Sequence, residues 1–435
     1  MSMLSRLNRC VVMLLSVLCL LNTSIVTCIA APVAASVTAA ESHTANTGFD
    51  VPSITLPRSG VSAKQLALII NERDPVSVQI GYYYQQSREI PRQNVIRVRF
   101  DPYQSEMQPG AFVVMQKLIE AQLPAGIEAY ALAWSSPYKV GCMSITSAFA
   151  FGYNQDYCIG GCKLTRRSEY FRSSALQPFS QLGIRPAMML SARNIKEAEQ
   201  LIDRGIAADG SWPNGRALLL ETPDKARSVR KVYFPLIEQQ LGERIEVVSR
   251  KGRNVKDQRR LMFYFTGDRV VKHIASNHFY PGAMADHLTS SGGQLIDSLQ
   301  MSAMRWLEGG ATGSYGTVVE PCNHLGKFPN PLLAMDYYLK GATLLEAYWK
   351  SVEMPGQGVF IGEPLASPYR AYRLQWLGDS WLLWSPVLTS GRYKLLAADQ
   401  AGGAYYTVHP SLRVKANQAV ELMPPIRPFY RLERL

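Results

Sequence analysis

The chain has 435 residues, of which 47% are apolar and 18% charged, and its formal net charge at pH 7 is +12. This composition excludes a disordered or fibrous chain, and the length is sufficient for a large core divided among two or more domains. The basic surplus is moderate and no nucleic-acid-binding motif accompanies it, so we expect no nucleic-acid partner.

The first 40 residues have the features of a signal peptide. MSMLSRLNR carries two arginines and no acid, and the apolar run CVVMLLSVLCLL follows it. Cleavage after Ala35 or Ala40 would leave a mature chain of net charge +10, because only the two arginines are lost. Lipidation at Cys28 is disfavoured by the preceding Thr27, and the run barely reaches the roughly 20 residues of a membrane span. We expect an exported protein of the periplasm, cell surface or extracellular space, with no membrane span after the leader.

A flexible N-terminus at residues 41–61 is expected to precede an α/β domain at 62–368. Within it, an apolar run at 64–74, a helical pattern that begins at Pro75 and a second apolar run at 94–100 form a strand, helix, strand unit. The same alternation returns at 110–134, 230–250 and 294–321. Such repetition is typical of an α/β fold with a mostly parallel sheet flanked by helices and right-handed crossovers.

Two segments depart from this alternation. Residues 137–215 are rich in glycine, tyrosine and serine and contain three cysteines, which predicts an insertion over one edge of the sheet. After residue 368, short and partly alternating apolar runs are separated by glycine-bearing turns. We expect a small antiparallel β module at 369–435.

Four cysteines follow the leader, namely Cys142, Cys158, Cys162 and Cys322. An even number in an exported protein favours disulfides. The glycine pair in CIGGC, residues 158–162, would let the first two sulfurs of that motif meet or would serve a bridge that staples a loop. A metal site would need two more close ligands, and none is adjacent in the sequence.

Acidic residues follow several of the apolar runs. In open α/β sheets, ligands bind beyond the carboxyl ends of the strands, so these positions define a candidate ligand-binding crevice. It contains Asp268, Asp286, Glu320 and Glu363. Such a crevice would suit a cationic group or a divalent cation, although no cofactor motif is evident. The alternative is that these acids cap helices and pair with nearby arginines.

The stretch ADHLTSSGG, residues 285–293, supplies the candidate catalytic residues Asp286, His287 and Ser291. Asp286 and His287 are neighbours and would point to opposite faces of a strand, which argues against a dyad. A nucleophilic Ser290 or Ser291 would need a histidine to reach it.

The two glycines of this stretch, Gly292 and Gly293, precede a helical pattern, so their amides are candidate ligand-binding groups for an anion or oxyanion. A plain turn with capping serines would use the same residues. Cys322, two residues before His324, is an alternative nucleophile or a disulfide partner.

The blocks LIINERDPVSVQIGYYYQQSREIP, PGAMADHLTSSGG, GGATGSYGTVVEP and GVFIGEPL resemble an uncharacterised family of exported bacterial proteins. More distantly, the second half is similar to caspase-type domains, including gingipain-like and CHAT-type peptidases. That resemblance implies a strand ending at the nucleophile, a helix, a second strand, further helices and a strand ending in GEP. The peptidases carry His-Gly and a cysteine where this chain has Thr266-Gly267-Asp268 and Ser290-Ser291 or Gly292, so the resemblance does not support thiol peptidase activity.

Two hypotheses remain open. In the first, the protein is a secreted hydrolase with a site around Asp286, His287 and Ser291. In the second, it is a non-catalytic caspase-like protein that serves as a binding or scaffold module in the envelope. Arginine-rich stretches such as DKARSVRK and RKGRNVKDQRR would suit an envelope polyanion, whereas the acidic crevice would suit a cationic peptide.

Overall fold

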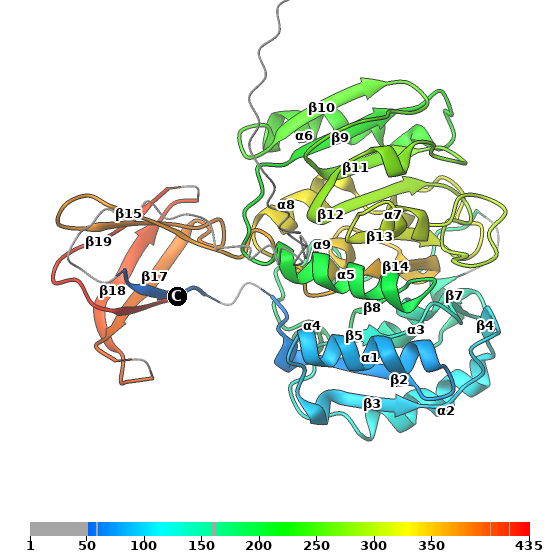
Figure 1. Ribbon diagram of the computed structural model, residues 1–435, viewed down its shortest axis with the longest axis horizontal. Coiled ribbons are helices and arrows are strands. Elements are labelled where there is room, and N and C mark those ends of the chain that lie inside the picture. The colour runs from blue at the N-terminus through cyan, green and yellow to red at the C-terminus, as the bar shows by residue number, and fades with distance from the viewer. Residues whose placement is uncertain (1–50, 58–59, 159–161, 401, 417) are drawn as a thin grey trace, which may run out of the picture. The chain divides into compact units, whose positions relative to one another are not determined.

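The computed structural model describes residues 51–57, 60–158, 162–400, 402–416 and 418–435. The leader, and most of the segment expected to be a flexible N-terminus, lie outside these ranges. A ten-stranded sheet dominates the fold, in the order β10-β9-β11-β12-β13-β14-β8-β5-β2-β3. Helices cover both of its faces (Figure 1). The predicted α/β class is confirmed.

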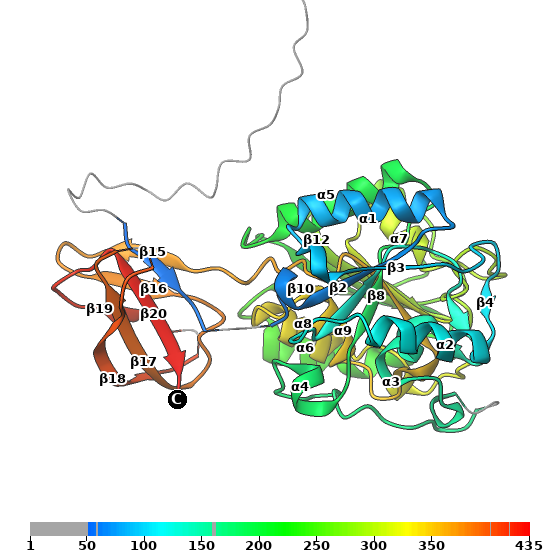
Figure 2. The ribbon, with the colours of Figure 1, turned by 90° about the horizontal axis from the view of Figure 1, so that it is seen from below.

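The N-terminal half of the sheet has four parallel strands in the order β8-β5-β2-β3. Its strands are β2 (Leu66–Asn71), β3 (Val95–Val98), β5 (Ala129–Leu132) and β8 (Ala187–Met189). Its helices are α1 (Pro75–Ser87), α2 (Pro109–Glu120), α3 (Ile145–Phe151), α4 (Pro178–Leu182) and α5 (Ile195–Ala208). Figure 2 shows α1 and α5 on one face of the sheet and α2 and α3 on the other.

Helix α1 begins where the sequence predicts. Pro75 occupies its first turn, where no intrahelical amide donor is needed, and the Asp74 carboxylate accepts a hydrogen bond from the amide of Val76 at 2.9 Å. The helix buries Ile80 and Tyr84 against the sheet. The register of this first unit is therefore set by a cap and a buried stripe that are both visible in the sequence.

The C-terminal half has five parallel strands in the order β10-β9-β11-β12-β13. They are β9 (Arg216–Glu221), β10 (Glu246–Lys251), β11 (Leu261–Gly267), β12 (Phe279–Leu288) and β13 (Gly313–Thr317). The helices that follow them are α6 (Phe234–Leu241), α7 (Met304–Glu308), α8 (Pro331–Leu339) and α9 (Leu344–Trp349). Short 3-10 helices are η1 (Ala63–Gln65), η2 (Arg92–Asn94), η3 (Gln155–Tyr157), η4 (Ser228–Tyr233), η5 (Ile274–Ser276), η6 (Leu325–Lys327) and η7 (Pro355–Gln357).

Strand β14 (Gly358–Gly362) joins the two halves. It is antiparallel to β13 and meets β8 at the single residue pair Ile361–Met189. From β12 onward, the elements follow in the order that the caspase-type resemblance implies: β12, α7, β13, α8, α9 and β14. Leu295 and Ile296, which follow β12, line one cavity together with Trp134 and Ser135, which follow β5. The carboxyl ends of the two halves therefore lie at the same edge of the sheet.

The expected insertion at 137–215 is wrong for much of its length. Strand β8 occupies a central place in the sheet, and α5 packs against α1. Residues 145–150 of α3 are buried, and the Ser144 hydroxyl donates to the Gly358 carbonyl at 2.6 Å. Strands β6 (Lys139–Val140) and β7 (Met143–Ser144) of this segment form a small three-stranded sheet with β4 (Glu106–Met107). The small residues of this segment permit close packing, although their composition alone predicts a loop.

The C-terminal strands form two small sheets around a core of their own. One sheet contains β15 (Arg373–Trp376), β16 (Trp381–Trp384) and β19 (Val420–Leu422), and the other contains β17 (Gly391–Ala398), β18 (Tyr406–Val414) and β20 (Phe429–Arg434). These pairings are antiparallel. Strand β1 (Ser53–Thr55) adds to β20 in parallel. Residues 53–55 are thus paired, in contrast to the flexible segment expected there; the domain limits at 62 and 368 stay predictions.

Candidate functional site

The stretch ADHLTSSGG lies at the carboxyl end of β12, beside the end of β11. In the parallel pairing of these strands, Thr266 is opposite His287 and Gly267 is opposite Leu288. Thr266-Gly267 and Ser290-Ser291 therefore follow adjacent strands at one edge, as the caspase-type resemblance implies. The contacts of each side chain decide what chemistry this edge can perform.

His287 is held inside the fold, with 2% of its surface exposed. Its Nδ1 accepts a hydrogen bond from the indole N–H of Trp306 at 3.0 Å, and its Nε2 donates to the Met301 carbonyl at 3.2 Å. An indole only donates and a carbonyl only accepts, so the ring is fixed as the Nε2–H tautomer. Burial, with the positive charge of Arg230, lowers the pKa of His287 to about 3. Both ring nitrogens are thus occupied by the protein itself.

Asp286 faces the other side of β12, as the alternation of side chains along a strand requires. Its Oδ1 lies 2.5 Å from Nη1 of Arg230, and both side chains are only 2% exposed. Burial raises the pKa of the Asp286 carboxyl, and the guanidinium of Arg230 opposes that rise. Arg230 also donates to the Thr266 carbonyl at 2.7 Å. The pair therefore ties η4 to the strands β11 and β12, and Asp286 does not contact His287.

Ser290 and Ser291 are held by the segment that follows them. The Gln300 side-chain carbonyl accepts from the amides of Ser290 at 2.9 Å and Ser291 at 3.4 Å, and it also contacts the Thr289 hydroxyl. The Ser291 hydroxyl lies 3.2 Å from that of Ser298. Within the described ranges, neither serine contacts a histidine. The amides of these two serines thus bind a side chain of the chain itself.

The helix expected after Gly293 is wrong over most of its length. Residues 294–303 form turns, and α7 covers only Met304–Glu308. The Gly293 amide donates to the Thr317 carbonyl at 2.9 Å, so it is not free at a helix start. A Cβ on Gly293 would clash with the carbonyl oxygen of Gly316. The glycines therefore permit close approach of this segment to β13.

The end of β11 is covered by the connection that leaves β9. A Cβ on Gly267 would clash with the carbonyl oxygen of Arg227, and the Thr222 hydroxyl donates to the Gly267 carbonyl. The Thr266 hydroxyl donates to the Leu220 carbonyl at 3.1 Å. The two positions that correspond to the peptidase His-Gly are thus used to pack the 222–228 connection onto the sheet.

The four acids do not form one crevice. Glu363 follows β14, whose direction is opposite to that of β13, so it lies at the other edge of the sheet from the ends of β11 and β13. There it binds Arg88 at 2.6 Å and accepts from the Tyr84 hydroxyl at 2.7 Å. Asp268 lies 3.5 Å from Arg253. The expected crevice required all of these strands to run in parallel, but β14 is antiparallel to β13. Glu363 and Asp268 pair with arginines instead.

Glu320 is exposed, and its Oε1 accepts from the amide of Cys322 at 2.8 Å. It therefore supports the turn that carries Cys322 rather than joining the other acids. Among the described residues, no group of three or more His, Cys, Asp or Glu side chains is placed to hold a metal ion.

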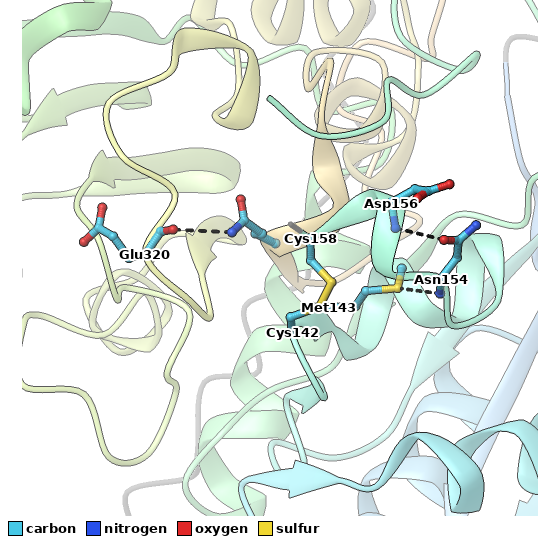
Figure 3. The surroundings of a disulfide bond; sticks show 7 residues. Cys142, Met143, Asn154, Asp156, Cys158 and Glu320 are labelled. Carbon is cyan, nitrogen blue, oxygen red and sulfur yellow. Dashed lines mark hydrogen bonds between the residues drawn. A yellow bond between two sulfur atoms is a disulfide. The ribbon is translucent and has the colours of Figure 1, made fainter. Parts of the chain in front are cut away.

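All four cysteines are paired, which confirms the predicted disulfides. The bridges are Cys142–Cys158 and Cys162–Cys322, so a local bridge within CIGGC is not formed. Figure 3 shows the first bridge beside Asn154, whose side-chain oxygen accepts from the amide of Asp156 at 2.8 Å. Cys322 has no free thiol for nucleophilic attack. The neighbouring His324 donates from Nε2 to the Cys162 carbonyl at 2.7 Å.

The N-terminal half has a cavity at the place where such sheets bind ligands. Strand β2 connects to β3 on one side while β5 connects to β8 on the other, so the strand order reverses between β2 and β5. A cavity of about 370 Å³ lies at this point, lined by residues that include Asp74, Trp134, Ser135, Leu295 and Ile296. The acidic residues that follow the strands do not indicate this cavity, because the strand order locates it.

No protein-family model and no curated protein matches the chain. Among solved structures, a complex of the pro- and mature domains of Porphyromonas gingivalis RgpB aligns with 84% of this chain and 94% of its own, at a TM-score of 0.45 and 10% identity. A structure of a protease aligns with 86% of this chain and 98% of its own, at 0.36 and 10%. At these scores the likenesses carry no information about the chemistry of this chain. Within the described ranges, no helix is both long and apolar enough to cross a membrane.

Proposed function

We propose that the protein is an exported caspase-like protein that acts as a binding or scaffold module and has no thiol peptidase or serine hydrolase activity. One observation carries the proposal: both nitrogens of the buried His287 ring are hydrogen-bonded to Trp306 and Met301. A general base must reach the proton that it removes and needs a pKa near the working pH. A buried imidazole whose pKa is lowered to about 3 meets neither requirement.

The other candidate groups support the same proposal. Asp286 is neutralised by Arg230, Cys322 is bonded to Cys162, and the amides of Ser290 and Ser291 bind Gln300. Each of these contacts stabilises the fold. Two disulfides are typical of proteins in oxidising compartments, which supports export of the chain.

Activity-based labelling tests this proposal. We expect the mature chain, which has lost Cys10, Cys19 and Cys28 with the leader, to remain unlabelled by a fluorophosphonate and by iodoacetamide under non-reducing conditions. Iodoacetamide labelling after reduction is the positive control, because reduction frees Cys142, Cys158, Cys162 and Cys322. Fluorophosphonate labelling that disappears in Ser291→Ala or Ser290→Ala, while both variants keep the wild-type melting temperature, would overturn the proposal and favour the secreted hydrolase.

A further inference from the structure

Three basic connections meet at the carboxyl edge of the C-terminal half. The first follows β9 and carries Lys225, Arg227 and Lys231; the second follows β10, which ends at Lys251, and carries Arg253; the third follows β11 and carries Arg269 and Lys272. The strands β10, β9 and β11 are adjacent and parallel, so their carboxyl ends lie side by side. Three separate stretches of the sequence thereby form one surface, here called the basic edge and defined by these seven side chains.

Contacts between the connections confirm that they adjoin. The Glu221 carboxylate binds Lys231 at 2.6 Å and Lys251 at 3.7 Å, one from each of the first two connections. Asp268, at the end of β11, lies 3.5 Å from Arg253. The Asn254 side chain accepts from the amide of Lys272 at 2.8 Å. Each connection of the basic edge is therefore in contact with a neighbouring strand or connection.

The basic edge has a surplus of positive charge that its own acids do not balance. Against seven cationic side chains, the same connections carry the four carboxylates Glu221, Asp224, Asp257 and Asp268. The side chains of Lys251 and Arg253 are 86% and 62% exposed, whereas that of Asp268 is 5% exposed. The cations thus reach solvent while an opposing acid is withdrawn. Such a surface attracts anions and repels a cationic peptide.

We propose that the basic edge binds a linear anionic polymer whose repeating units carry phosphate, sulfate or carboxylate groups. This inference rests on the proposed function, for which it names the chemistry of the partner. Neighbouring strands lie about 4.8 Å apart, so the ends of three strands present cations in a row that an extended polymer can follow. Lysine and arginine heads on long flexible stems adapt to the spacing of the anionic groups.

Inorganic polyphosphate of long chain length is the probe for this proposal. We expect the full chain to bind fluorescently labelled polyphosphate in a polarisation assay, with an affinity that falls steeply between about 50 and 300 mM NaCl because salt screens exposed charges. In the variant Lys251→Gln/Arg253→Gln/Lys272→Gln, the affinity at 50 mM NaCl is expected to fall at least about tenfold. The salt slope is expected to fall by about one for each phosphate contact that is lost.

A matched variant separates the basic edge from net charge. Arg73→Gln/Arg92→Gln/Lys117→Gln removes the same charge from exposed positions in the N-terminal half and is expected to change the affinity less than about twofold. Equal losses in the two variants, no binding of polyphosphate at 50 mM NaCl, or binding to phosphatidylglycerol vesicles alone would each overturn the inference. Circular dichroism confirms that both variants are folded. These outcomes leave the labelling test of the proposed function unaffected.

Discussion

The two halves of the central sheet share a topology but treat the ends of their strands differently. In each half the strand order reverses once, between β2 and β5 and between β9 and β11. The first reversal carries a cavity of about 370 Å³. At the second, the connection after β9 packs its main chain onto Gly267, and Thr222 donates to the same residue. Topology therefore marks where a site can form, while the residues of the connections decide whether it is open.

Buried ion pairs give the strongest test of this contrast. Arg230→Met leaves Asp286 buried, and among the described residues Arg230 is the only side chain that pairs with it. We expect the free energy of unfolding to fall by about 3–5 kcal/mol, as measured by urea denaturation. In the matched variant Arg88→Met, Glu363 keeps the hydroxyl of Tyr84, so the expected loss is smaller, about 1–3 kcal/mol.

The double variant Arg230→Met/Asp286→Leu completes that test. Because it removes both charges, it should recover a large part of the loss. If Arg230→Met alone lowers the free energy of unfolding by less than about 1 kcal/mol, the ion pair does not stabilise the carboxyl edge of the C-terminal half. The contrast between the halves would then lose its energetic basis.

Glycine substitutions test the packing at the carboxyl end of β11 and are expected to have smaller effects on stability. Gly267→Ala places a methyl group against the carbonyl oxygen of Arg227, and we expect it to lower the free energy of unfolding by about 1–3 kcal/mol. In the control Gly110→Ala in α2, the new Cβ meets nothing within 4 Å and should raise stability by up to about 1 kcal/mol. Equal melting temperatures for the two variants would show that the 222–228 connection does not rest on β11.

Much of this organisation could be predicted from the sequence. The helix at Pro75 and the strands that alternate with helices follow local patterns of apolar residues, which are short-range information. The separation of Asp286 from His287 could also be predicted, because neighbouring residues on a strand point to opposite faces. Disulfide formation was also predictable, since it required only the count of cysteines and the expectation of export.

Other features depend on contacts that a local pattern does not contain. Residues 294–303 do not form the helix that their periodicity predicts, because Gln300 accepts a hydrogen bond from the Ser290 amide and Ser298 donates one to the Ser291 carbonyl. Predicting the position of Glu363 would have required the direction of β14, which depends on the pairing of strands across the whole sheet. Arg230 belongs to the stretch DKARSVRK, which was expected to suit a polyanion, yet it lies buried in η4. It precedes Phe234, Ile237 and Leu241, the buried residues of α6, at the spacing of one helical face, so its burial could have been predicted.

The pH dependence of stability gives the smallest expected effect and tests whether the buried His287 ring stays unprotonated in the folded protein. Its pKa is lowered to about 3 in the folded protein, against about 6.5 when the ring is exposed by unfolding. Between these values the unfolded chain binds more protons, so stability is lost as the pH falls below 6.5. His287→Phe removes this proton uptake, and the decrease in the free energy of unfolding from pH 6 to pH 5 should be about 1 kcal/mol smaller than in the wild type. The exposed His278 supplies the control His278→Phe, which should keep the wild-type profile because its ring meets water in both states. A profile of His287→Phe identical to the wild type would mean that the imidazole takes up its proton in the folded protein, and the argument against a catalytic base would fail with it.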